Sequence, residues 1–508
     1  MKRWITSALA LMMTLAVFGC GGRSAPEEEE IAKNAPNYSD ATGEFMTYAY
    51  SPPTDGTWWI DTDTKNDGVD YRTYENYVIY KESGLNTLLQ QSARYDGEDF
   101  ETSTLKRVMD DSFRAGITRT IVWDTRIWAL SAKETSLIGA DDGQFADHAA
   151  LVTQIGTWME AYKDHEAFYG VMLIDEPTWK QMPQVCEVYK AVKDAAAAGG
   201  YEVFVQENLL PYYGDKKDLV DPSTEGYADM TKADAYRAYL VNFVSNSDAD
   251  RICMDSYPLL NPSADRYTVR NQHFINLQIM AEVAKEYNCK LTGVACSTGA
   301  TDISGSTVLL KAPNRSEMYW QVNAYLGFGC DSLSYYTYWR KQQNSATYLH
   351  TDGTAFVSQD GTPTDLYYSM QKIHGEIQKF APTFLNFKYQ GANYYYKKPL
   401  SYGSAYVDNL VPDEFTVLQD VRVPVDNIAV VTELKDEAKN QYMYMVMNPQ
   451  APSNGFNGTV GLEAELDFGT EYSAVAVWFN GELTYRKLVD GKVTFKLGAG
   501  YAAFVMPY

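Results

Sequence analysis

Eight apolar runs, separated by amphipathic segments, constrain the fold of this chain more than any other feature. The runs cover residues 45–50, 84–90, 118–126, 169–177, 201–208, 251–258, 290–299 and 330–339. Each run lacks the polar alternation of a half-exposed strand, so the runs predict strands that are covered on both faces. The amphipathic segments at 103–116, 147–165, 182–200, 269–288 and 369–385 predict helices. This alternation predicts an α/β fold, a (β/α)8 TIM barrel, over residues 41–386.

The sequence pattern changes after residue 386. Short apolar runs at 427–434, 440–449, 459–466, 474–483, 492–497 and 502–508 are broken by Asn-Gly, Asp-Gly and Gly-rich turns, and no helical pattern lies between them. Such turns join antiparallel strands. Residues 387–508 are therefore predicted to form a small C-terminal antiparallel β-sandwich.

Residues 1–20 have the organisation of a signal peptide, with Lys2 and Arg3 before an apolar stretch at 4–18. The "VFGC" that ends at Cys20 resembles the lipobox of bacterial lipoproteins, although Phe18 replaces the usual small residue. The resemblance implies that Cys20 is lipidated; an ordinary secretory signal with a chance cysteine is the alternative. Residues 21–40, which contain "PEEEE", predict an acidic flexible tether. The expected location is the bacterial cell envelope, outside the cytoplasm, with membrane contact through the lipid only.

Charge and histidine spacing exclude several function classes. The formal net charge is −23 at pH 7, and no basic stripe or phosphate-binding glycine loop is present, which argues against a nucleic-acid partner. The five histidines show no metal-ligand spacing, so no metal or other cofactor is expected. The five cysteines after Cys20 are odd in number and form no CxxC, and they are interpreted as buried thiols.

Chemistry in a (β/α)8 barrel lies at the carboxyl ends of the strands, and carboxylates and aromatic rings dominate these ends. In chain order they carry Asp124 and Arg126; Asp175 and Glu176; Gln206, Glu207 and Asn208; Asp255 and Tyr257; Ser297 and Thr298; and Tyr336, Tyr338 and Trp339. No Ser-His-Asp set and no strand-end lysine occurs, which argues against triad hydrolases and Schiff-base aldolases. A carboxyl pair suits cleavage of a glycosidic bond, which needs a proton donor and a second group that stabilises the oxocarbenium ion.

The barrel, a glutamate ending the fourth strand, a tryptophan ending the eighth and the trailing sandwich together resemble clan A glycoside hydrolases. The resemblance implies that Glu176 is the general acid/base and that Trp339 lines the sugar subsite. Two departures are clear: Asp175 stands where the clan has asparagine, and the seventh strand ends in Ser297 and Thr298 rather than in a nucleophilic glutamate.

The pair Asp175-Glu176 is also similar to the paired carboxylates of substrate-assisted hexosaminidases, including bacterial β-N-acetylgalactosaminidases. That resemblance implies that Asp175 polarises a 2-acetamido group, which then replaces the missing nucleophile. Adjacent strand residues point to opposite faces, so both carboxylates reach one pocket only if the chain leaves regular strand geometry there. Otherwise Asp175 has a structural role and Glu176 alone faces the site.

These residues predict a surface-tethered glycoside hydrolase, exo-acting and retaining, of β-hexosaminidase or β-galactosidase type, whose substrate is an oligosaccharide or glycan. Asp255 is a third catalytic candidate, as a nucleophile or base, or else it positions Tyr257. The substrate-binding candidates are Glu207, Tyr257, Trp339, Tyr336, Trp123, Asp124 and Trp179. The alternative is a non-catalytic glycan-binding lipoprotein on the same barrel, because one expected carboxylate is absent.

Overall fold

The computed structural model describes residues 25–55, 69–139, 143–263, 266–270, 272–302, 308–340, 348–350, 354–396, 410–425, 427–450 and 461–508. Every one of the eight apolar runs overlaps a strand, and the eight strands form two four-stranded parallel sheets, ordered β2-β3-β4-β5 and β1-β12-β9-β6. Their bounds are β1 Met46–Ala49, β2 Leu88–Tyr95, β3 Thr120–Asp124, β4 Phe168–Asp175, β5 Phe204–Asn208, β6 Arg251–Asp255, β9 Lys290–Cys296 and β12 Ser332–Tyr336.

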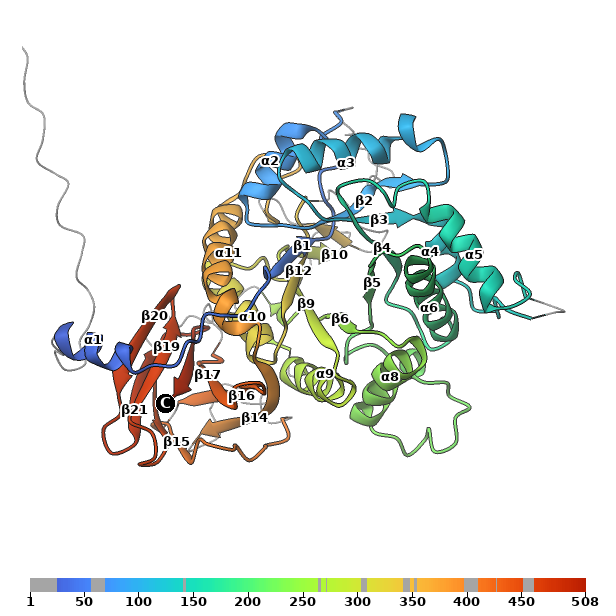
Figure 1. Cartoon of the computed structure of the whole chain (residues 1–508). Helices are drawn as coiled ribbons and strands as arrows, with labels where there is room; N and C mark the ends of the chain where they lie inside the picture. Colours follow the sequence, from blue (N-terminus) through green and yellow to red (C-terminus); the bar gives the residue numbers. More distant parts are fainter. Residues whose placement is uncertain are drawn as a thin grey trace, which may run out of the picture.

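The two sheets surround a common interior (Figure 1). A parallel bridge between Leu209 and Met254 joins β5 to β6, and the backbone N–H groups of Asn86 and Thr87 donate to the Thr47 carbonyl between β1 and β2. All eight strands contribute to one interior cluster: Met46, Tyr48, Tyr50, Leu89, Ile121, Met172, Cys253 and Val294, with Trp123, Tyr169, Phe204 and Tyr336 packed against it. Alternate residues on each strand face outward to the helices, which gives the both-faces burial that the sequence predicts.

Helices cover the outside of the sheets. They are α2 Tyr74–Glu82, α3 Thr104–Arg114, α4 Thr125–Ser131, α5 His148–Met159, α6 Met182–Ala198, α7 Lys216–Leu219, α8 Lys232–Ser247, α9 His273–Tyr287, α10 Arg315–Gly327 and α11 Asp365–Phe384, with a short 3-10 turn at Phe100–Thr102. The five predicted helices correspond to α3, α5, α6, α9 and α11. The sequence analysis missed α8 and α10, although both begin with a capping box, at Thr231 and Asn314.

Short strands extend the connections at the carboxyl ends of β6 and β9. A hairpin of β7 Leu259–Ser263 and β8 Arg266–Val269 follows β6. β10 Ala300–Asp302 and β11 Val308–Leu310 follow β9, and they form a three-stranded sheet with β13 Tyr348–His350, which follows β12. These insertions account for much of the length of the region beyond that of a minimal barrel.

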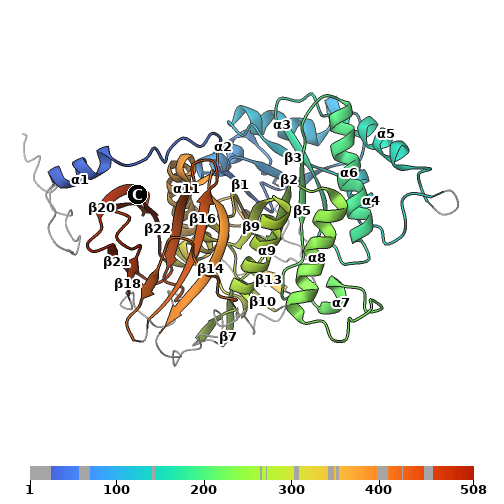
Figure 2. The same ribbon diagram turned by 60° about the horizontal axis from the view of Figure 1, so that its bottom comes forward.

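The C-terminal region contains a six-stranded antiparallel sheet, β14-β16-β17-β22-β19-β20, and a three-stranded one, β15-β18-β21 (Figure 2). The bounds are β14 Lys388–Tyr396, β15 Asp420–Arg422, β16 Ile428–Asp436, β17 Gln441–Met447, β18 Leu462–Asp467, β19 Ala474–Phe479, β20 Glu482–Lys487, β21 Lys492–Leu497 and β22 Ala502–Pro507. The run at 474–483 is two strands rather than one, because Asn480 and Gly481 adopt positive φ angles of 52° and 81° and reverse the chain.

This C-terminal region packs against the helical layer. Phe380 of α11 stacks on Trp478 with ring centroids 4.8 Å apart, and the Trp320 indole of α10 donates to the Pro449 carbonyl at 2.9 Å. Gly327 allows the close approach of Met445, whose sulfur would lie 2.1 Å from an added Cβ. The two C-terminal sheets therefore pack against the outer surface of the helical layer.

The proposed lipidation residue, Cys20, and the whole signal peptide lie outside the described residues. The expectation of a flexible tether needs correction for part of its length, because Ala25–Lys33 form helix α1. Acidic residues in the first turns favour a helix, as they interact with its positive amino end. The helix contacts β20, and the Tyr508 hydroxyl donates to the Ile31 carbonyl at 3.1 Å. Among the described helices, none is long and apolar enough to cross a bilayer.

Candidate active site

The end of β4 departs from regular strand geometry at the two acidic residues. The register with β5 shifts between Met172 and Asp175, so that Asp175 pairs with the inward-facing Asn208. Glu176 then adopts a left-handed backbone, with φ of 51°, while its N–H donates to the Asn208 carbonyl at 2.8 Å. A side chain other than glycine or asparagine is uncommon in this conformation, which costs energy. The bulge and the left-handed residue together turn both carboxyl groups to the interior side.

Three carboxyl groups meet at this point. The Glu176 and Asp255 carboxyl groups lie close enough for the charge of Asp255 to be the largest influence on the pKa of Glu176. The Asn208 amide donates to Asp175 Oδ1 at 3.0 Å and lies 3.3 Å from Asp255 Oδ1, and the Tyr50 hydroxyl donates to Asp175 Oδ1 at 3.3 Å. Asp175 and Glu176 are exposed to solvent, whereas Asp255 lies beneath them and is only 3% exposed. We call Asp175, Glu176 and Asp255 the carboxyl cluster.

Glu176 and Asp255 differ in their affinity for a proton. The negative charge of Asp255, then partial removal from water and then the charge of Asp175 raise the pKa of Glu176 far above its ordinary value. Burial and the charge of Asp175 raise the pKa of Asp255 by less, because the Asn208 and Glu176 hydrogen bonds stabilise its ionised form. Near neutral pH the pair therefore holds one proton, with Glu176 as its main carrier.

Tyrosine rings border the carboxyl cluster. Tyr257 and Tyr336, both predicted as binding residues, stack on each other with centroids 5.6 Å apart, and Tyr50 lies edge-on to Tyr336 at 6.5 Å. Tyr213 lies near enough for the charges of Asp255 and Glu176 to raise its phenol pKa. The sequence analysis missed Tyr50 and Tyr213. Tyr50 could have been found as an inward position of the first strand, whereas Tyr213 lies in a loop that carries no motif.

Two of the predicted binding residues, Glu207 and Asp124, do not face the carboxyl cluster. Glu207 lies between the inward-facing Gln206 and Asn208, so its side chain points outward, where it is 4% exposed and neither carboxyl oxygen has a hydrogen-bond partner among the described residues. Burial, followed by the charge of Asp175, raises its pKa well above the ordinary value. Asp124 is fully buried and also faces outward. It accepts a hydrogen bond from the Arg126 backbone N–H at the start of α4 and another from the Tyr162 hydroxyl at 3.1 Å. Both are structural residues.

The three predicted tryptophans have different positions. Trp123 is half-buried on the interior side at the end of β3, with the Arg94 guanidinium 4.7 Å from its ring centre. Trp179 is half-buried beside α7, where its backbone N–H donates to the Asp218 backbone carbonyl at 2.8 Å. Trp339 is only 3% exposed, so its ring serves packing rather than an open binding surface.

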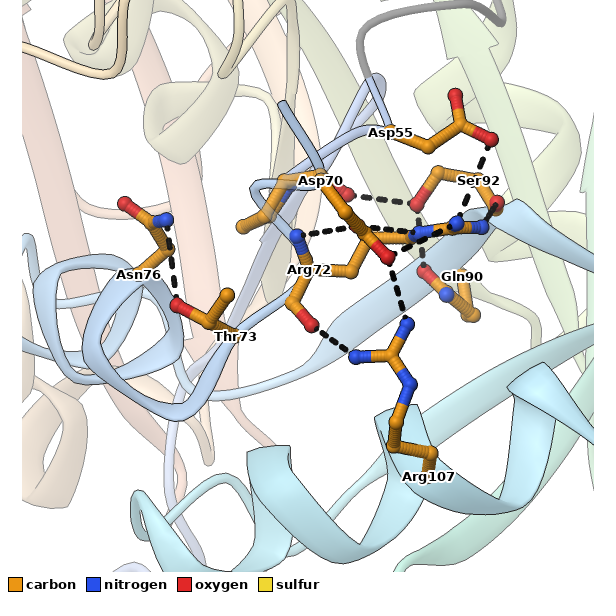
Figure 3. Close-up of polar contacts among 9 residues, drawn as sticks. Asp55, Asp70, Arg72, Thr73, Asn76, Gln90, Ser92 and Arg107 are labelled. Atoms are coloured by element: carbon orange, nitrogen blue, oxygen red, sulfur yellow. Dashed lines mark hydrogen bonds and ion pairs between the residues drawn. The ribbon is translucent and has the colours of Figure 1, made fainter. Parts of the chain in front are cut away.

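The packing of Trp339 involves the connection between β1 and α2. Its ring lies 4.9 Å from that of Tyr71. The neighbouring Arg72 forms ion pairs with Asp70 at 2.8 Å and Asp55 at 3.4 Å, and donates to the Ser92 carbonyl of β2 at 2.7 Å (Figure 3). Arg107 of α3 also reaches Asp70. This network fixes the segment that covers Trp339.

The end of β9 supplies no carboxylate. The Ser297 hydroxyl donates to the Thr337 carbonyl at 2.9 Å, and the Thr298 hydroxyl lies 3.0 Å from that of Thr354. Within the described part of the chain, no cluster of three or more histidine, cysteine or acidic residues is arranged to hold a metal ion.

No family model matches the chain, and no curated protein matches it. Solved structures to which the chain is similar include a GH27 β-L-arabinopyranosidase from Geobacillus stearothermophilus, with 10% identity over 92% of this chain and 97% of that one and a TM-score of 0.48. An Anoxybacillus α-amylase has 11% identity over 93% and 99%, with a TM-score of 0.48. A family 39 glycoside hydrolase from Bacteroides cellulosilyticus has 10% identity over 91% and 81%, with a TM-score of 0.42. Similarity at this level does not assign a family, and the functional argument rests on the residues.

Proposed function

We propose that the two parallel sheets are halves of one (β/α)8 barrel and that the protein is a glycoside hydrolase with its active site at the carboxyl cluster. One observation carries the proposal: Asp175, Glu176 and Asp255 meet at the carboxyl ends of two different strands, where the Asn208 amide donates to both aspartates and the charge of Asp255 raises the pKa of Glu176. Glycosidic cleavage requires one protonated and one ionised carboxyl group side by side. The stacked Tyr257 and Tyr336 supply flat apolar surfaces for a sugar ring.

The proton distribution assigns the roles. Glu176 donates its proton to the glycosidic oxygen as the bond to the anomeric carbon breaks, and ionised Asp255 attacks that carbon. Water then displaces Asp255 from the sugar and gives its proton to Glu176. An inverting enzyme needs carboxyl groups roughly 6.5–9.5 Å apart, with room for a water molecule. A retaining enzyme needs carboxyl groups about 5–5.5 Å apart, and the strong effect of the Asp255 charge on the pKa of Glu176 supports this closer spacing.

Asp175 supports a second route to the same stereochemical outcome. Its Oδ1 is held by Tyr50 and Asn208, beside the proton donor. In a substrate with a 2-acetamido group, Asp175 would orient that group, whose oxygen would attack the anomeric carbon in place of Asp255. A requirement for Asp175 on 2-acetamido sugars, but not on plain hexosides, separates this route from attack by Asp255.

Exo-action and surface attachment belong to the same proposal. The insertions after β6 and β9 add strands to the connections at the carboxyl ends of the barrel strands, and insertions there favour attack on a chain terminus over binding along a long polymer. The lipobox-like sequence ending at Cys20 supports a lipid anchor at the outer side of the cytoplasmic membrane or beyond. In bacteria fed a fatty-acid label, the full chain should take up the label and Cys20→Ala should not.

A screen of aryl glycosides tests the function. It includes N-acetylgalactosaminide, N-acetylglucosaminide, galactoside, glucuronide and mannoside, with product stereochemistry read by NMR. Hydrolysis with retention, reduced at least about a hundredfold by Glu176→Gln, is expected. Inversion would refute the assignment of Asp255 as nucleophile. Binding of glycans without turnover of any of them would instead establish the glycan-binding alternative.

A further inference from the structure

Arg270 brings a positive charge to the edge of the carboxyl cluster. It follows β8, where the hairpin inserted after β6 returns to the site. Its backbone N–H donates to the Pro258 carbonyl at 2.7 Å, and its Nε donates to the Tyr257 carbonyl at 3.3 Å. These bonds attach Arg270 to the segment that directly follows Asp255. The guanidinium is therefore fixed relative to the proposed nucleophile.

The guanidinium lies over the ring of Tyr213, with its central carbon 3.7 Å from the ring centre. Stacking fixes the plane of the group and leaves its edges available for hydrogen bonds. Nε donates to the Tyr257 carbonyl, whereas no described residue accepts a hydrogen bond from Nη1 or Nη2 of Arg270 or forms an ion pair with it. Within the described part of the chain, four of the five N–H donors of this half-buried arginine therefore have no acceptor.

An unpaired, half-buried cation is unusual, because removing a charge from water is unfavourable without a partner. Partial burial lowers the pKa of Arg270, whereas the phenol of Tyr213 and the charge of Asp255 act in the opposite direction. Asp255 is close enough to act on Arg270 through space, yet its side chain accepts a hydrogen bond from the Asn208 amide rather than from the guanidinium. Arg270 is therefore placed beside the reacting groups without being neutralised by them.

The position of Tyr213 explains this separation. Burial and the charges of Asp255 and Glu176 raise the pKa of its phenol, whereas the charge of Arg270 lowers it. Tyr213 is therefore close to both the cation and the carboxyl cluster. It keeps the guanidinium next to the site while Glu176 retains its proton.

We propose that Arg270 is a specificity-determining residue that binds an anionic substituent, a carboxylate or a sulfate, on the sugar cleaved at the carboxyl cluster. The paired Nη donors match the two oxygens of a carboxylate, and sulfate presents the same chemistry. The chain has a net charge of −23, so a local cation is what would allow an acidic glycan to approach. This inference rests on the proposed function, since it names the substrate class of the same site.

The test compares acidic and neutral sugars that are otherwise identical. The probes are methyl β-glucuronide with methyl β-glucoside, methyl β-galacturonide with methyl β-galactoside, and 6-O-sulfated with unsulfated N-acetylglucosamine. Binding is measured by calorimetry on the full chain carrying Glu176→Gln, so that turnover does not interfere. The first two pairs report on a carboxylate and the third on a sulfate.

The acidic member of at least one pair should bind at least tenfold more tightly than its neutral partner, and Arg270→Met should reduce that ratio to about one. Arg270→Lys keeps the charge but not the planar fork, and should give an intermediate ratio. Arg114→Met is the matched control, because Arg114 also lies over a tyrosine, Tyr74, but on the outer helix α3. It should leave the ratio unchanged.

Equal binding of the acidic and neutral members of every pair would refute the inference. So would an unchanged ratio in Arg270→Met that still unfolds at the wild-type temperature. The proposed function fails separately: selective binding lost with Arg270, together with no hydrolysis of any glycoside by the wild-type chain, would establish an acidic-glycan binding protein.

Discussion

Replacement of Glu176 by glutamine should make the protein more stable as it makes it inactive. The folded chain keeps Glu176 protonated well above pH 4.5, the ordinary value for its pKa, whereas the unfolded chain releases the proton. Folding must therefore take up a proton as pH rises above 4.5, and stability falls with pH until Glu176 ionises in the folded state. Glutamine has the same shape and is neutral without taking up a proton, so the variant does not lose free energy of unfolding in this way.

The size of the effect follows from the linkage relation. Holding the proton at pH 7, about 2.5 units above the unfolded pKa, costs at most about 3.4 kcal/mol, at about 1.36 kcal/mol per unit. Glu176 is exposed, so solvent screening reduces this, and we expect about 1–2 kcal/mol. Below pH 4.5 the two proteins should be equally stable.

The assay is urea unfolding of wild type and Glu176→Gln at a series of pH values from 4 to 8. The difference in the free energy of unfolding should grow with pH and favour the variant. Glu134→Gln, which changes an exposed glutamate in the connection after α4, is the control and should show no such growth. A difference that stays flat across the range would refute the proton-sharing argument and, with it, the role of Glu176 as acid.

Three further predictions concern the same region. The pH profile of kcat/KM should be bell-shaped, since Asp255 must be ionised and Glu176 protonated. Because both pKa values are raised, both limbs should lie above the range of ordinary carboxyl groups, and an optimum near pH 4 would contradict this. Asn208→Ala removes the amide that orients Asp175 and Asp255, so kcat should fall at least about tenfold without loss of fold by circular dichroism. Glu207→Leu removes a buried carboxyl group without partners and should raise the free energy of unfolding by about 1–3 kcal/mol in urea titrations; a large loss of activity would show that Glu207 belongs to the site after all.

The strands could be located from the sequence because burial on both faces leaves a clear pattern of continuous apolar residues. The same pattern hides which residues point inward. Glu207 and Asn208 are neighbours at the end of one strand, and only their register with β4 shows that Asn208 belongs to the site and Glu207 to the helical layer. The sequence therefore identified the strand end correctly but assigned a binding role to the wrong side chain.

The paired orientation of Asp175 and Glu176 depends on a local irregularity. Two adjacent residues of a regular strand point to opposite faces, so Asp175 and Glu176 can face one pocket only if the strand is irregular there. The amino-acid sequence does not show whether this irregularity occurs. The register shift before Asp175 and the left-handed backbone of Glu176 supply it. Arg270 could not be predicted for a different reason. It lies beyond a hairpin inserted after β6, whereas the sequence indicates only residues at the ends of the barrel strands.

The left-handed backbone of Glu176 also has a consequence for the evolution of this fold. A glutamate at φ of 51° is retained against a conformational preference that glycine and asparagine satisfy better. Stability alone would favour glycine or asparagine here, so the proposed catalytic role of the carboxyl group accounts for the glutamate. On that proposal, relatives with the same bulge that carry glycine or asparagine at this position should lack glycosidase activity, and those that carry glutamate should retain it.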